Sequence, residues 1–133
     1  MQRISSIALS ALVFGLAHCG GDDPPPGGAG NEAQQRGVGD ACGTDTDCVE
    51  AGQSCLANFK GGYCGVRNCN GNADCPDGSA CVAHTDGVNY CFLLCAEKYQ
   101  CNYYRPASDE SNCSANITFV DNNKGAKACV PPS

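Results

Sequence analysis

The spacing of the cysteines constrains this sequence more than any other feature. Thirteen of its 133 residues are cysteine, and twelve of them lie between residues 42 and 129. The twelve form three groups of four that each begin with C-x5-C, and the groups are separated by four and then three residues. Trp is absent and large aliphatic residues are sparse after residue 16. We therefore expect cross-links, rather than a conventional core, to offset the entropy of ordering the chain.

The three groups define an internal repeat, which we number unit one (39–66), unit two (67–93) and unit three (94–131). The text between the cysteines repeats as well: "DTDCVEAGQSC" in unit one corresponds to "NADCPDGSAC" in unit two, and "FKGGYC" corresponds to "DGVNYC". Unit three is looser, with eleven and fifteen residues between its later cysteines. The Asp and Asn residues ahead of Cys48 and Cys75 are typical turn formers, whose side chains accept backbone N–H bonds.

Each unit predicts one short β-hairpin, because apolar segments flank a glycine-containing turn. In unit three the expected hairpin joins "NITFV" to "AKACV" through "DNNKG". The predicted fold class is small and disulfide-rich: three hairpin units in tandem, with little other regular structure, behind an N-terminal signal helix and a disordered tether. Four cysteines allow three pairings. We favour first-to-third and second-to-fourth in each unit, which clamps the N-terminal turn onto the hairpin.

The cysteines predict disulfides and no metal site. Structural zinc sites favour C-x2-4-C knuckles, often with His, whereas this chain has no CxxC and its nearest spacing, Cys91-x3-Cys95, spans a unit boundary. The absence of CxxC also argues against a thioredoxin-like redox site. A calcium site built from aspartates of units one and two is an alternative, but no EF-hand-like loop is present. No cofactor is expected. The cysteines assigned to disulfides are Cys42, Cys48, Cys55, Cys64, Cys69, Cys75, Cys81, Cys91, Cys95, Cys101, Cys113 and Cys129.

The first 18 residues have the pattern of an export signal, with Arg3 followed by the apolar run "ISSIALSALVFGLA". Cleavage before His18 would secrete the protein with one unpaired thiol. Alternatively, "LAHC" at 16–19 resembles the bacterial lipobox, in which the cysteine is acylated; His18 departs from that pattern, where Gly, Ala or Ser is usual. Acylation of Cys19 leaves an even number of cysteines, so we favour a lipoprotein whose acyl chains hold it on a membrane.

The segment 19–38 is polar and rich in Gly and Pro, so it predicts a flexible tether between the lipidated cysteine and a domain over 39–131. Gly20 after the cysteine favours an outer-membrane location, on the periplasmic or the surface face, with secretion as the alternative. The net charge is −6, and no basic stripe is present. Binding to nucleic acid is therefore not expected.

Residues 39–82 carry a family resemblance, through the recurring pattern "C-x-x-x-x-D-C…G-x-x-C…G-x-C". The chain resembles the cysteine-rich repeats of bacterial lipoproteins, and its spacing is similar to that of the N-terminal cysteine-rich domain of the Dickkopf proteins. The resemblance implies a scaffold, not an activity. The extracellular signalling role of Dickkopf does not carry over, because no receptor-binding residue can be matched.

Catalytic motifs are missing: the sequence has no G-x-S-x-G elbow and no phosphate-binding loop. After removal of the signal, His84 is the one imidazole, and "AHTDG" predicts an exposed hairpin tip. Large side chains gather instead in "YCFLLC" and "CNYYRP". One interpretation is a small core between units; the other is a contact patch of Tyr103, Tyr104 and Arg105, since Tyr and Arg are favoured interface anchors.

The sequence thus predicts a membrane-anchored, exported and non-catalytic binding module with an envelope protein or glycan as partner. A structural envelope component without a specific ligand is the first alternative. A secreted inhibitor or toxin-like factor is the second.

Overall fold

The computed structural model describes residue 33 and residues 37–133. The predicted signal peptide over 1–18, the predicted lipidation residue Cys19 and most of the predicted tether over 19–38 therefore lie outside the described residues. Within them the protein is a small disulfide-rich fold of short antiparallel strands and four 3-10 turns, as predicted. No helix among them is long and apolar enough to cross a membrane.

Six disulfides connect the twelve described cysteines, and their order is the same in every unit. Unit one has Cys42–Cys55 and Cys48–Cys64, unit two has Cys69–Cys81 and Cys75–Cys91, and unit three has Cys95–Cys113 and Cys101–Cys129. This first-to-third and second-to-fourth order is the one that the sequence favours. So many disulfides persist in an oxidising compartment, so the protein is an exported one.

Every unit starts with a 3-10 turn, η1 (Asp45–Asp47), η2 (Asn72–Asp74) or η3 (Lys98–Cys101). The side chain before the second cysteine caps each turn. Asp47 accepts the N–H groups of Gly43 and Thr44, Asp74 accepts that of Asn70, and Gln100 accepts those of Ala96 and Glu97. The bonds from Thr44 and Gly43 hold the pKa of Asp47 below its usual value. The turn-former prediction for units one and two is confirmed.

Units one and two each form the predicted hairpin. Strands β1 (Ser54–Cys55) and β2 (Cys64–Gly65) pair in unit one, and β3 (Ser79–Ala83) and β4 (Asn89–Cys95) pair in unit two. The turn of unit one needs glycine: Gly62 has a φ of +66°, and a Cβ there would overlap the carbonyl oxygen of Cys42.

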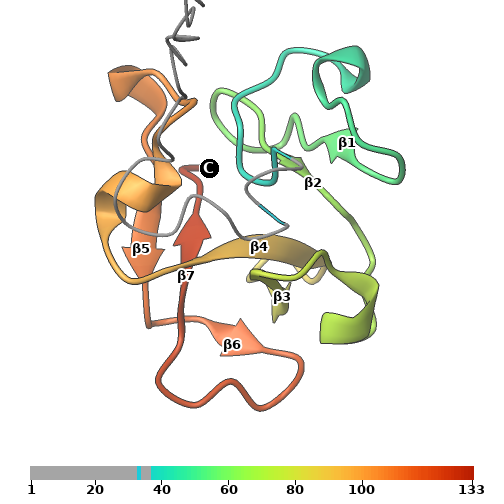
Figure 1. Cartoon of the computed structure of the whole chain (residues 1–133), viewed down its shortest axis with the longest axis vertical. Coiled ribbons are helices and arrows are strands. Elements are labelled where there is room, and N and C mark those ends of the chain that lie inside the picture. Colours follow the sequence, from blue (N-terminus) through green and yellow to red (C-terminus); the bar gives the residue numbers. More distant parts are fainter. Residues whose placement is uncertain (1–32, 34–36) are drawn as a thin grey trace, which may run out of the picture.

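The hairpin predicted in unit three is not formed. Strand β6 (Thr118–Phe119) pairs with β3, whereas β7 (Lys127–Val130) pairs with β4 and with β5 (Asn112–Ser114). Units two and three therefore share one five-stranded sheet, in the order β5-β7-β4-β3-β6, rather than following each other as separate hairpins. The longer loops of unit three let its strands reach across unit two. Figure 1 shows β6 at the end of the molecule opposite to β1 and β2.

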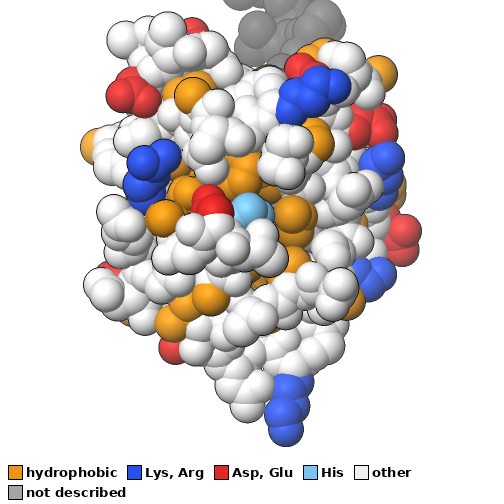
Figure 2. Space-filling view, turned by 180° about the vertical axis from the view of Figure 1, so that it is seen from behind, with side chains coloured by type: hydrophobic (Ala, Val, Ile, Leu, Met, Phe, Trp, Pro, Cys, Tyr) orange, Lys and Arg blue, Asp and Glu red, His pale blue; other side chains and the backbone are white. Residues whose placement is uncertain are grey.

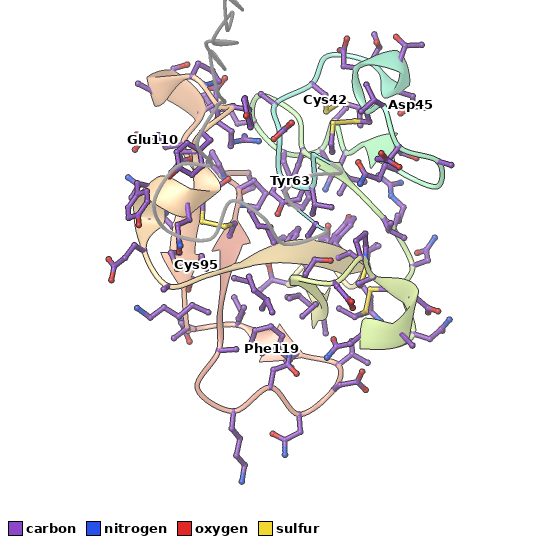
Figure 3. The ribbon with its side chains drawn as sticks, in the orientation of Figure 1. Cys42, Asp45, Tyr63, Cys95, Glu110 and Phe119 are labelled. Carbon is purple, nitrogen blue, oxygen red and sulfur yellow. A yellow bond between two sulfur atoms is a disulfide. The ribbon has the colours of Figure 1, made fainter. Side chains whose placement is uncertain are left out.

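An aromatic core lies where unit one meets the large sheet. Tyr63, Tyr90 and Phe92 are buried with Phe59, and their rings make edge or stacked contacts 5.1–6.2 Å apart. The Tyr63 hydroxyl accepts the Leu93 N–H at 3.0 Å. Figure 3 places Tyr63 between unit one and β4. This core contains Phe92 and Leu93, which agrees with the core interpretation of "YCFLLC".

The folded region begins before residue 39, where the sequence places its start. Val38 is buried in the core, and so is Ala33, whose N–H donates to the Asp77 carbonyl at 2.7 Å. Two apolar residues in an otherwise polar segment have no periodic pattern, so composition alone assigns them to the tether.

Candidate functional site

The predicted contact residues Tyr103, Tyr104 and Arg105 follow η3 directly, and the structure separates them. Tyr104 is 70 % exposed and Tyr103 is 37 % exposed. Tyr99, within η3, is 50 % exposed, and its ring meets that of Tyr103 edge to face at 6.1 Å. We call Tyr99, Tyr103 and Tyr104 the tyrosine surface. Tyr99 was missed at the sequence level, although "KYQCNYY" places three tyrosines within six residues.

Arg105 does not belong to this surface, which corrects the prediction that it forms part of a contact patch. Its side chain is only 7 % exposed. The guanidinium donates to the carbonyl oxygens of Lys60, Gly62 and Gly39 at 2.9, 2.7 and 3.2 Å, and its Nε donates to that of Asp109 at 2.8 Å. It also lies over the Tyr63 ring, 5.8 Å from the centroid. A planar group with five donors suits such a cluster of carbonyls. Arg105 therefore fastens unit three to unit one.

The tyrosine surface sits on a firmly held segment. The disulfides Cys95–Cys113 and Cys101–Cys129 fix both ends of η3, Arg105 fixes the residue after the tyrosines, and Lys98 pairs with Glu110 at 2.6 Å. Partial removal from water and the nearby Tyr99 raise the pKa of Tyr103. The Tyr103 hydroxyl is therefore protonated at neutral pH and can donate a hydrogen bond.

Asp40 lies in the same junction between the units. Burial raises the pKa of its carboxyl to about 6, while the charge of Arg105 acts in the opposite direction. A half-buried carboxylate beside an arginine that donates to four carbonyl oxygens is only partly compensated.

His84 is not the exposed histidine that the sequence predicts. Its side chain is 15 % exposed, its ring packs edge-on against Phe59, Tyr90 and Phe92, and its Nδ1 lies 3.2 Å from Asp86 Oδ1. Figure 2 shows a histidine side chain beside hydrophobic side chains and an acidic one. A hairpin tip folded back onto a core cannot be recognised from a local sequence.

Asp86 connects His84 to a wider polar group. The Tyr90 hydroxyl donates to Asp86 Oδ2 at 2.8 Å, and Asn58 Nδ2 donates to the Tyr90 hydroxyl at 3.2 Å. Although partial burial acts to raise the pKa of Asp86, the bonds from Val88 N–H, Tyr90 and His84 hold it below its usual value. Tyr90 has a raised pKa, through burial and through Asp86. The group ties the hairpin tip of unit two to Asn58 in unit one.

A hollow of about 320 Å³ opens between units one and two, and His84 does not line it. The described residues that do are Ala51, Gly52, Gln53, Val66, Ala73, Asp74, Cys75 and Pro76. The Nε2 and Oε1 atoms of Gln53 are covered and form no hydrogen bond to any described residue. Leaving such a group unpartnered costs about 1–3 kcal/mol. No sequence signal distinguishes Gln53 from an ordinary surface glutamine.

The twelve described cysteines offer no thiolate to a metal. Three sulfur clusters lie within ligand distance of one another, one in each unit, but every sulfur in them belongs to a disulfide. Two of the aspartates considered for calcium bind backbone N–H groups as caps, and Asp45 accepts the Cys55 N–H at 2.8 Å.

The chain matches no protein-family model, no curated protein and no solved structure.

Proposed function

We propose that the protein is a lipid-anchored binding module of a bacterial envelope, which holds a protein or glycan partner and catalyses no reaction. The observation that carries the proposal is the tyrosine surface: three exposed aromatic side chains on a segment held by two disulfides and a buried arginine. Tyrosine gives a large contact area at a low cost in side-chain entropy, and rigid support lowers that cost further.

The anchor part of the proposal rests on Cys19. The twelve cysteines that the structure describes are paired with each other, which leaves Cys19 as the cysteine for acylation. Acylation consumes this thiol, and several acyl chains hold a protein firmly on a membrane. An outer-membrane location agrees with Gly20 at the next position.

The absence of catalysis is the part of the proposal that draws on His84. Its ring closes one edge of the aromatic core and its Nδ1 faces Asp86, so the imidazole has a structural role that explains its position.

Cross-linking in intact cells tests the binding surface. Tyr104 is replaced with photoreactive benzoylphenylalanine, and Val120, an exposed residue next to β6, is replaced in the same way as a control. We expect a discrete product from position 104, none from position 120, and loss of the product when Tyr99→Ala and Tyr103→Ala are added. Equal products from both positions, or no product from position 104, would contradict the proposed surface.

The anchor has its own test, the unreduced intact mass of the mature protein from isolated membranes, with and without alkylation. We expect acyl chains on Cys19, six disulfides and no thiol that reacts. A protein found in the medium, beginning at His18 with one reactive thiol, would contradict the lipid anchor and favour the secreted inhibitor or toxin-like factor.

A further inference from the structure

The same turn occurs in units one and two. The side chain of its last residue has a hydrogen-bond partner among the described residues in unit two but not in unit one. In unit one the N–H of Gln53 donates to the Glu50 carbonyl at 3.2 Å, and Gly52 has a φ of +87°. In unit two the N–H of Ser79 donates to the Pro76 carbonyl at 2.9 Å, and Gly78 has a φ of +92°. Gln53 and Ser79 thus occupy equivalent positions.

The Ser79 hydroxyl donates to the same Pro76 carbonyl at 2.6 Å, so unit two keeps this side chain within its own turn. The longer Gln53 side chain has no such partner, although its amide is covered. It is in the wall of the hollow of about 320 Å³, which falls within the ~300–1,000 Å³ range of ligand pockets. Because Gln53 lines the hollow, its unpartnered amide lies beside the space that a ligand would occupy.

We propose that this hollow binds an extended, positively charged peptide segment, with the Gln53 amide paired to a peptide group of the ligand. A primary amide presents one donor side and one acceptor side, so Nε2 can donate to a peptide carbonyl while Oε1 accepts the peptide N–H. The wall also contains four short apolar side chains, which suit small side chains of a peptide, although more of its exposed surface is polar than apolar: Ala51, Val66, Ala73 and Pro76.

The charged residues around the hollow indicate that its ligand is positively charged. Asp74 lines it, and Glu50 and Asp77 stand in the two turns that border it. The guanidinium of Arg67, next to Val66, lies 5.9 Å over the Tyr90 ring and donates to Asn58. With a net charge of −6 over the whole chain, electrostatic attraction favours lysine or arginine in the partner.

A glycan fits the hollow less well, because none of its described lining residues is aromatic and the C–H face of a sugar ring packs best on an aromatic ring. Val49, which is 82 % exposed in the loop before Ala51, extends the apolar surface and suits a peptide that continues beyond the hollow. The hollow belongs to units one and two and the tyrosine surface to unit three. Peptide binding in the hollow is therefore independent of the proposed function, and each can fail without the other.

Nuclear magnetic resonance on the ¹⁵N-labelled mature protein tests the site. The probe is the acetylated and amidated tetrapeptide Ala-Lys-Ala-Lys, compared with Ala-Glu-Ala-Glu and with N-acetylglucosamine. We expect the basic peptide to produce saturable shifts of the Gln53 side-chain amide and of the backbone amides of Val66 and Asp74. The acidic peptide and the sugar should produce none at the same concentration.

Two variants of Gln53 serve as matched probes. Gln53→Ser gives unit one the residue that unit two has, and Gln53→Leu keeps the size without the amide; each should weaken peptide binding about tenfold, the effect of losing two hydrogen bonds. Val120→Ala, an exposed position that does not line the hollow, should leave the affinity unchanged. Binding unaffected by both Gln53 variants, shifts with the sugar alone, or no shift with the basic peptide would each overturn the proposal.

Discussion

Units one and two differ from unit three in what happens between the cysteines, although all three have the same disulfide order. Each unit begins with a 3-10 turn that is capped by the residue before its second cysteine. In units one and two a hairpin then closes locally, whereas in unit three β6 pairs with β3 of unit two and β7 pairs with β5 and with the end of β4, so that β6 and β7 do not pair with each other. The disulfides span 12–16 residues in units one and two and 18 and 28 residues in unit three. The pattern of cross-links therefore sets the turns, and loop length decides whether the strands pair locally.

The difference extends to function. The tight units create a hollow where they meet, and the loose unit carries the tyrosine surface on its first turn. Four changes test this difference between the units, and each targets a different contact.

Removing the second disulfide of a unit should have the largest effect. Cys101→Ser with Cys129→Ser opens a loop of 28 residues, and Cys75→Ser with Cys91→Ser opens one of 16. The chain-entropy relation gives a loss of about 3.5 kcal/mol for the first pair and about 3 kcal/mol for the second. Urea unfolding of both double variants measures the losses. A clearly smaller loss in unit three would show that its long loops are held by packing rather than by the cross-link.

Gly62→Ala should cost about 3 kcal/mol, because the added Cβ overlaps the Cys42 carbonyl in addition to the ~1–2 kcal/mol of a left-handed alanine. Gly125→Ala in unit three is the matched control: Gly125 has a φ of +76°, but nothing lies within 4 Å of the added Cβ. It should cost only the conformational part, about 1 kcal/mol. Thermal unfolding of the two variants compares the sites, and equal losses would mean that the turn of unit one can relax.

Arg105→Met tests the link between unit three and unit one. It removes the donors to four carbonyl oxygens while it keeps much of the apolar stem, and we expect a loss of about 2 kcal/mol. Tyr104→Ala, one residue earlier and exposed, should change the free energy of unfolding by less than about 0.5 kcal/mol. Chemical unfolding of both variants measures the two losses of unfolding free energy. Similar losses would contradict a specific role of Arg105 in linking unit three to unit one.

Asp40→Asn should have the smallest effect, and its sign depends on pH. The folded-state pKa of about 6 lies above the ordinary value of 3.8, so the native state binds the proton more tightly. The stabilisation from this group is fully present below about pH 3.8 and is lost as the pH rises through about 6. At pH 7 the variant should be more stable than the parent, by about 1 kcal/mol after allowance for the half-exposed position.

Melting temperatures of parent and variant between pH 4 and pH 8 check this expectation. The two curves should separate between about pH 4 and pH 6 and keep a constant offset above that range. An offset that stays the same from pH 4 to pH 8 would mean that Arg105 fully compensates the carboxylate of Asp40.

Local sequence patterns were sufficient to predict the disulfide-rich class, the three units, the turns at Asp47 and Asp74, and the hairpins of units one and two. Cysteine spacing and turn residues act over a few residues, so their consequences can be derived locally. The other features depend on tertiary contacts: the pairing of β6 with β3, the burial of Val38, His84 and Arg105, and the unpartnered amide of Gln53. Each depends on which distant segments meet, and neither burial nor hydrogen-bond partners are written in the residues alone. Adjacent residues such as Tyr104 and Arg105 can therefore have similar interface propensities and opposite environments.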